Sequence, residues 1–239
     1  MPRQDSNHQD HQDFTMTHHR ARTTATALAL AASLALGLGA CGGSSSDDSS
    51  GETGWGEIEG GQAADEGTVL EQPFDKPDVT LTDTSGEPYN LREETDGHVT
   101  LVYFGYTHCP DICPLTMSNI ALAADTLTEE QRQDLRVVFI TTDPERDTPE
   151  SLGDWLRAQS PDFTGLTGDF ETIQQTARAI GVGLEEPYVA EDGGVVSTHG
   201  TQVLAFLPSD DRAHVVYTEG VTAETFERDL PKLLNGELP

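Results

Sequence analysis

Hydrophobic positions along the C-terminal two-thirds of the chain form short apolar runs separated by amphipathic stretches. Residues 99–104 and 136–142 are rich in β-branched and aromatic side chains and predict two buried strands, with a helix over about 114–127 between them. A strand, helix, strand order implies a parallel pair with a right-handed crossover. Thr148 followed by Pro149 then predicts another helix, because threonine caps helices and proline suits their first position.

The remaining pattern extends this unit on both sides. The further predicted elements are a hairpin (79–81 with 89–91), a helix over about 170–180, a second hairpin (201–207 with 214–218) and a last helix from Thr222. Gly181 is expected to close the third helix, and Pro231 to kink or interrupt the last one. Strands paired in both directions and flanked by helices predict an α/β, thioredoxin-like fold with a central mixed sheet and an N-terminal β-hairpin extension.

The N-terminal end has a different composition. Residues 25–40 are almost wholly Ala, Leu, Gly, Thr and Ser, and small residues stand just before Cys41. An apolar stretch of about 16 residues is shorter than the roughly 20 that a spanning helix needs. We therefore interpret residues 1–41 as a lipoprotein signal peptide with a lipobox, in which Cys41 is lipidated; the alternative is an uncleaved transmembrane anchor. Either interpretation puts the folded part on the extracytoplasmic face of the cell membrane, lipid-anchored in the first case.

Between this segment and the predicted fold lies a polar stretch. Residues 42–72 are dominated by Gly, Ser, Asp and Glu, which cannot bury enough apolar area to offset the entropy of ordering. We interpret them as a disordered acidic tether. Residues 73–239 then form one thioredoxin-like domain.

Charge excludes one class of partner. The chain has 13 Lys and Arg against 42 Asp and Glu; without the three Arg and three Asp of residues 1–41 the balance is 10 against 39, so the net charge stays at −29. Binding to phosphate backbones requires the opposite sign, so we expect no nucleic acid partner.

The candidate chemistry lies in a dithiol. If Cys41 carries lipid, Cys109 and Cys113 are the remaining cysteines of the three, and they stand four apart where an apolar strand turns into a helix. A helix N-terminus favours thiolate over thiol, so both sulfurs are expected to suit metal binding or disulfide chemistry. As a structural disulfide the pair would close too short a loop to restrict the unfolded chain much.

Two thiolates suit Cu(I), and an added imidazole makes a set that also holds Cu(II). The candidate histidines are His98, His108, His199 and His214. Three of them are expected at the surface or in packing roles, whereas His199 follows a Gly-rich stretch and precedes a strand that can deliver it to the dithiol.

Two acids lie close to these motifs. Asp111 stands between the thiols, and Asp143 ends the strand next to theirs, so either can modulate the pKa of the thiols or attract a cation. The pattern over residues 143–148 favours a turn and helix cap, in which Arg146 pairs with Asp147 or another acid.

Residues 103–114 (YFGYTHCPDICP), residues 143–149 (DPERDTP) and His199 resemble the Sco/SenC family, copper-binding proteins of thioredoxin fold that serve cytochrome c oxidase assembly. The resemblance covers about residues 70–236. In that family both cysteines of the CxxxC loop and a distant histidine bind copper, which implies Cys109, Cys113 and His199 here. Many members have Asp before that histidine, where this chain has Thr198.

The resemblance implies a membrane-tethered metallochaperone rather than an enzyme. It would bind Cu(I) or Cu(II) and deliver it to the dinuclear copper site of an oxidase subunit, and it would work with an upstream copper donor or thiol reductant. The main alternative is a thiol–disulfide oxidoreductase in which Cys109 and Cys113 are catalytic, form a disulfide and reduce the cysteines of the oxidase site. A peroxiredoxin and a zinc-binding module are weaker alternatives.

Overall fold

The computed structural model describes residues 66–190, 193–198 and 200–239. Its strands are β1 (Thr68–Asp75), β2 (Thr80–Asp83), β3 (Pro88–Asn90), β4 (Val99–Gly105), β5 (Leu135–Thr141), β6 (Thr164–Thr167), β7 (Tyr188–Val189), β8 (Val195–Val196), β9 (Val203–Leu207) and β10 (Arg212–Tyr217). Its helices are α1 (Leu91–Glu94), α2 (Ile112–Asp125), α3 (Glu129–Gln133), α4 (Pro149–Gln159), α5 (Phe170–Ala179) and α6 (Ala223–Leu234). Among these helices, none is both long and apolar enough to cross a membrane.

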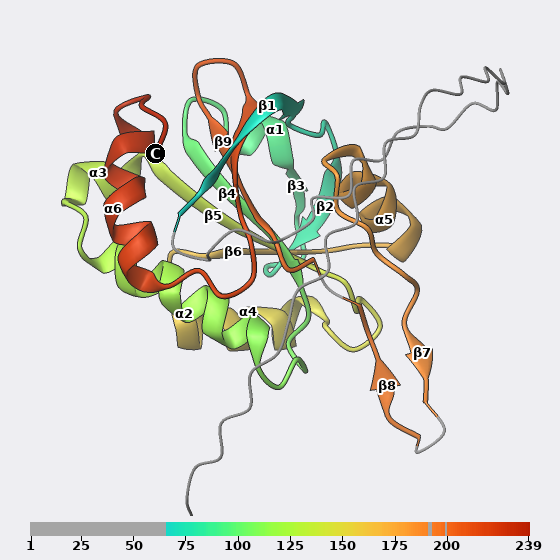
Figure 1. Ribbon diagram of the computed structural model, residues 1–239. Helices are drawn as coiled ribbons and strands as arrows, with labels where there is room; N and C mark the ends of the chain where they lie inside the picture. The colour runs from blue at the N-terminus through green and yellow to red at the C-terminus, as the bar shows by residue number, and fades with distance from the viewer. Residues whose placement is uncertain (1–65, 191–192, 199) are drawn as a thin grey trace, which may run out of the picture. The chain divides into compact units, whose positions relative to one another are not determined.

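A mixed sheet organises the described residues, with strand order β1-β10-β9-β4-β5-β6-β2-β3 (Figure 1). β4 pairs in parallel with β5 and antiparallel with β9, and β5 continues in parallel to β6. The predicted thioredoxin-like α/β fold with its mixed sheet is therefore confirmed, including the hairpin of β2 and β3.

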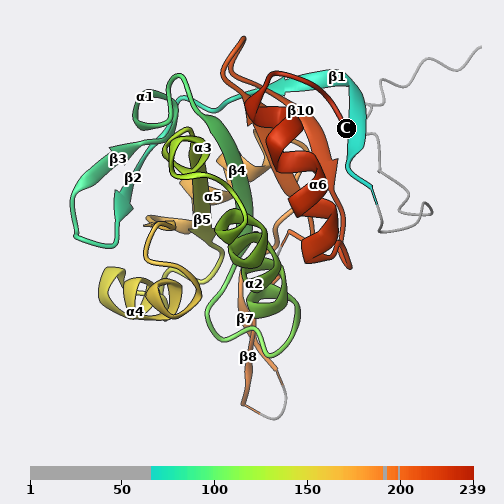
Figure 2. The ribbon, with the colours of Figure 1, turned by 90° about the vertical axis from the view of Figure 1, so that its left-hand side faces the viewer.

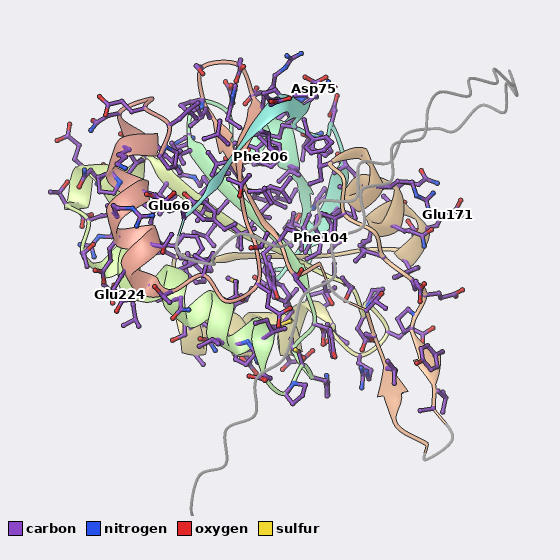
Figure 3. The ribbon with its side chains drawn as sticks, viewed as in Figure 1. Glu66, Asp75, Phe104, Glu171, Phe206 and Glu224 are labelled. Atoms are coloured by element: carbon purple, nitrogen blue, oxygen red, sulfur yellow. The ribbon has the colours of Figure 1, made fainter. Side chains whose placement is uncertain are left out.

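Helices cover the sheet on both faces (Figure 2). Apolar side chains of α2, α4 and α6 pack on one face, against alternate residues of β4, β5 and β9. Those of α1 and α5 pack on the other face, against the intervening residues. β4 is buried along its whole length, and Figure 3 shows Phe104 at the centre of the domain, whereas the labelled Glu171 and Glu224 lie on outer helices. This burial explains why β4 is a continuous apolar run rather than an alternating one.

Several elements differ from the sequence prediction, which had no counterpart for α1, α3 or β6. Helix α6 continues through Pro231 to Leu234, so the expected interruption is wrong. Pro231 removes one hydrogen bond to the carbonyl four residues earlier, but burial of Phe226, Leu230 and Leu233 keeps the helix on the sheet. Strand β1 begins at Thr68, within the segment expected as tether, because its backbone pairs with β10 despite largely exposed side chains. Tertiary pairing overrides composition there.

The segment before residue 199 also contains structure. β7 and β8 form an antiparallel hairpin that projects from the domain (Figure 1), where a Gly-rich loop was expected. Its four strand residues, Tyr188, Val189, Val195 and Val196, are all exposed. The signal peptide and Cys41 lie outside the described residues.

Gly105, the last residue of β4, is packed against the dithiol. A Cβ atom there would lie 2.8 Å from the Cys113 sulfur and 2.9 Å from the Tyr103 ring. Both distances are shorter than van der Waals contact, so no side chain fits at this position. Because glycine has none, the Cys113 sulfur and the Tyr103 ring can pack directly against the backbone at the end of β4.

We predict that Gly105→Ala lowers the free energy of unfolding of the reduced protein by about 1–3 kcal/mol, because the added methyl overpacks the junction. Urea denaturation measures the change. Gly183→Ala is the matched control, since its Cβ would meet nothing within 4 Å. Equal stability of the two variants would contradict the packing argument.

Candidate functional site

The site is built at the junction between β4 and α2. Strand β4 ends at Gly105, and α2 begins at Ile112 with Asp111 at its N-cap position. The Asp111 side chain makes no capping hydrogen bond, so it does not occupy the backbone N–H groups of the first turn. Those N–H groups are free to face another acceptor, as at any helix N-terminus.

Cys109 supplies that acceptor. Its sulfur is only slightly exposed, and burial acts to raise the pKa of the thiol. Hydrogen bonds from the backbone N–H groups of Asp111, Cys113 and Ile112 and from the Cys113 thiol outweigh burial, so the pKa of Cys109 falls below its ordinary value. The helix N-terminus therefore produces the expected effect on this cysteine.

Cys113 behaves in the opposite way. It lies in the first turn of α2 with no exposed surface, and burial raises the pKa of its thiol to about 12. Hydrogen bonds from Tyr103 and from the backbone of Tyr106 reduce this shift without cancelling it. The expectation that the helix end favours thiolate at both cysteines is therefore wrong for Cys113, because desolvation is the larger effect there.

The two sulfurs lie within hydrogen-bonding reach of each other, and both cysteines are free thiols in this structure. The pair consists of one slightly exposed sulfur whose pKa is lowered and one fully buried sulfur whose pKa is raised. Such a pair provides two soft ligands on one side of a metal ion, or an attacking and a resolving thiol for disulfide exchange.

A buried carboxylate holds the loop in front of Cys109. Asp147 has no exposed side-chain surface; it accepts hydrogen bonds from the Thr107 backbone N–H (2.9 Å), the Thr107 hydroxyl (2.6 Å) and the Thr141 hydroxyl (2.6 Å). Asp147 thereby connects the dithiol loop to the end of β5 by hydrogen bonds. From the sequence, Asp147 was expected only as a partner of Arg146. Its position after β5 was the available signal, since the carboxyl ends of parallel strands meet at one sheet edge.

Asp143 makes a second link at the same edge. Its buried carboxylate pairs with Arg146 and accepts a hydrogen bond from the Ser197 hydroxyl at 2.9 Å. Its carbonyl accepts from the backbone N–H groups of Arg146 and Asp147, which is the predicted turn. Arg146 therefore pairs with Asp143 and not with Asp147. The link connects β5 to the residue directly after β8.

The described histidines have local partners. His108 is 53% exposed and lies 3.6 Å from Asp147, His98 contacts Arg136, and His214 contacts Asp210, in line with their expected surface and packing roles. His199 lies outside the described residues. Thr198, the residue before it, bonds through its hydroxyl to the backbone N–H and C=O of Glu185.

The described residues therefore contribute two of the three expected ligands. Across residues 66–190, 193–198 and 200–239, no cluster of three or more His, Cys, Asp or Glu side chains is arranged to hold a metal ion.

Comparison with known proteins identifies the family of this chain. The SCO1/SenC family model matches residues 66–235, which is nearly the whole described part. The chain belongs to the SCO1/SenC family. This confirms the resemblance noted from the CxxxC and DPERDTP motifs.

Individual relatives agree with the family. A protein from Stutzerimonas stutzeri that is named for copper binding is 33% identical over 175 residues, which cover 72% of this chain and 84% of that protein. A SCO2-like protein from Rickettsia felis is 41% identical over 97 residues, and the match spans only 46% of its length. The structure of Bradyrhizobium japonicum ScoI with copper bound is 27% identical, with a TM-score of 0.57 over 68% of this chain and 98% of that one. Copper, expected from the sequence, is thus the metal named for the Stutzerimonas stutzeri and Bradyrhizobium japonicum proteins.

We predict that iodoacetamide modifies Cys109 much faster than Cys113 at about pH 7.5, because the thiolate is the reactive form. The lowered pKa keeps Cys109 partly ionised below its ordinary range, whereas Cys113, with a pKa of about 12, stays protonated. Peptide mass spectrometry of the reduced protein over a pH series measures both rates. Equal rates at the two cysteines would refute the asymmetry.

Asp147→Asn is expected to lower the free energy of unfolding by about 1–3 kcal/mol, because an amide NH₂ then faces buried donors in place of a carboxylate oxygen. Urea denaturation provides the measurement. Asp154→Asn is the control: its carboxylate pairs with Arg157 at an exposed site, and its loss should change stability by about 0.5 kcal/mol or less. If Asp147→Asn leaves the free energy of unfolding unchanged, the carboxylate does not hold the loop in place.

Proposed function

We propose that this protein is a copper chaperone that binds copper through Cys109, Cys113 and His199 and delivers it to the dinuclear copper site of a cytochrome c oxidase subunit. The observation that carries the proposal is the pair of adjacent free thiols at the β4–α2 junction of a SCO1/SenC family member. Soft thiolate ligands favour Cu(I), and an imidazole added to them extends the set to Cu(II).

The unequal thiols suit uptake and release. Cys109 lies nearer the surface and carries the lowered pKa, so it is the ligand that a donor or an acceptor site reaches first. Cys113 must lose its proton to bind metal, and its raised pKa makes copper binding release a proton at neutral pH. Incoming thiolates of the acceptor would then replace the ligands one at a time.

The assignment of His199 is supported by its described neighbours in the chain. Ser197 bonds to Asp143 at the end of β5, and a Cβ on Gly200 would lie 3.5 Å from Phe104 of β4. Phe104 immediately precedes Gly105, whose own Cβ would touch the Cys113 sulfur. The residues on both sides of His199 thus lie against the ends of β4 and β5, from which the dithiol loop and the loop after Thr141 emerge.

The cellular setting is part of the proposal. Lipidation of Cys41 after the apolar segment 25–40 would anchor the domain on the extracytoplasmic face of the cell membrane, within reach of a membrane-bound oxidase. An upstream copper donor or a thiol reductant would supply the metal or keep the thiols reduced.

A second function is favoured by one specific feature of the geometry: Cys109 accepts backbone hydrogen bonds at the start of α2, and Cys113 is fully buried beside it. A slightly exposed thiol with a lowered pKa, paired with a fully buried resolving thiol, suits disulfide reduction. Cys109 would attack a partner disulfide and release one partner thiol. Cys113 would then attack Cys109, release the second thiol and leave the Cys109–Cys113 disulfide.

We predict that the reduced protein binds one Cu(I) or Cu(II) ion and that His199→Ala weakens Cu(II) binding at least about tenfold, since one of three ligands is lost. Anaerobic copper titration measures the affinity, with the thiolate-to-Cu(II) charge-transfer band as a direct signature. His214→Ala is the control, because its imidazole pairs with Asp210.

The proposal fails if the reduced protein takes up no stoichiometric copper, or if His199→Ala holds Cu(II) as tightly as the parent. Reduction of a partner disulfide that depends on Cys113 and is unaffected by His199→Ala would favour the oxidoreductase instead.

A further inference from the structure

The Cys113 sulfur has a side-chain partner that the family resemblance did not assign. Tyr103 lies on β4 with almost no exposed surface, and its hydroxyl donates to the Cys113 sulfur at 3.5 Å, within the range for bonds to sulfur. Alternation along β4 points this side chain toward the face covered by α2, where Cys113 occupies the first turn. Thr116, three residues further along α2, hydrogen-bonds to the same phenol hydroxyl.

The surroundings of this contact are apolar. Tyr103 and Cys113 belong to the core cluster that includes Met117 and Phe139, and the Tyr103 and Phe139 rings pack in a tilted arrangement with centroids 5.8 Å apart. A hydrogen bond in such an environment is stronger than one in water, because no solvent competes for the donor or the acceptor. The ring is also held by packing, so loss of the hydroxyl alone leaves its shape in place.

We infer that Tyr103 is a positioning residue for the dithiol, which stabilises the reduced, metal-binding form of Cys113 through its O–H···S hydrogen bond. The metal-binding part of this statement rests on the proposed function; the effect on the thiol–disulfide balance does not.

The direction of the effect follows from the acceptor strength of sulfur. In the dithiol the Cys113 thiol donates to the Cys109 sulfur, and a group that donates becomes a better acceptor. The disulfide has no such proton, so the phenol stabilises the dithiol more than the disulfide. Hydrogen bonds to metal-bound thiolates also withdraw charge from sulfur and thereby tune the metal. Tyr103 would thus hold the pair in its reduced state and weaken electron donation from Cys113 to copper.

The test compares three proteins: the parent, Tyr103→Phe and Tyr217→Phe. Each is the full chain with Cys41→Ser, so that Cys109 and Cys113 are the thiols measured. Tyr217 is a matched control: it is a fully buried tyrosine of the same cluster, and its hydroxyl faces Asp229 and not a sulfur. The measured reaction is dithiol plus glutathione disulfide giving the Cys109–Cys113 disulfide plus two glutathione thiols, which is balanced in electrons and protons.

We predict that Tyr103→Phe shifts this equilibrium constant about three- to tenfold toward the protein disulfide, the effect of one net hydrogen bond, whereas Tyr217→Phe leaves it unchanged. Thr116→Val, which removes the hydroxyl that polarises Tyr103, should give a smaller shift of the same sign and serves as the test variant if Tyr103→Phe does not fold. An unchanged constant in the folded variants, or an equal shift in Tyr217→Phe, overturns the inference.

Copper spectra separate this inference from the proposed function. In Tyr103→Phe loaded with Cu(II), the thiolate-to-copper band should move to lower energy, because the sulfur donates more strongly without its hydrogen bond. If the parent binds no copper, the proposed function fails while the glutathione equilibrium still decides the role of Tyr103. If the parent binds copper and the equilibrium and the band are both unchanged in Tyr103→Phe, the inference alone fails.

Discussion

The parallel pairing of β4 with β5 is the constraint on which the site depends. Gly105 lies opposite Thr141 in this pairing, so the loop that carries the dithiol and the loop that begins at Thr142 leave the sheet at the same edge. Asp147 then joins the two loops through Thr107 and Thr141, inside the protein and away from water. A carboxylate without exposed surface keeps its position only if its oxygens are satisfied, and these three donors satisfy them.

The same junction gives two chemically similar cysteines different properties. Cys109 lies before the helix, where backbone N–H groups stabilise its thiolate, and Cys113 lies within the first turn, where the core removes water from its sulfur. The pKa values of the two thiols differ because of where each cysteine lies, since four residues, about one turn of helix, separate them. A dithiol of this kind suits both copper transfer and disulfide exchange, because each needs one accessible sulfur and one sheltered sulfur.

Sequence pattern predicted most of the framework. The runs at β4 and β5, the Thr148 cap of α4 and the hairpin of β9 and β10 were found because each has a strong local signal of burial, capping or turn chemistry. The missed elements have weak local signals. β1 is largely exposed, and β7 and β8 have two residues each. Helix α6 continues through a proline because burial of its apolar face outweighs the local cost of that proline.

By itself the sequence determined the fold class, the family, the dithiol and the candidate third ligand His199, because these depend on residue identity and spacing. Only the tertiary structure decided that Cys113 is desolvated, that Arg146 pairs with Asp143, and that Asp147 and Tyr103 contact the dithiol segment. These contacts join residues from separate strands and helices. Burial and hydrogen bonding between distant segments arise only when the sheet and helices pack, so no local pattern records them.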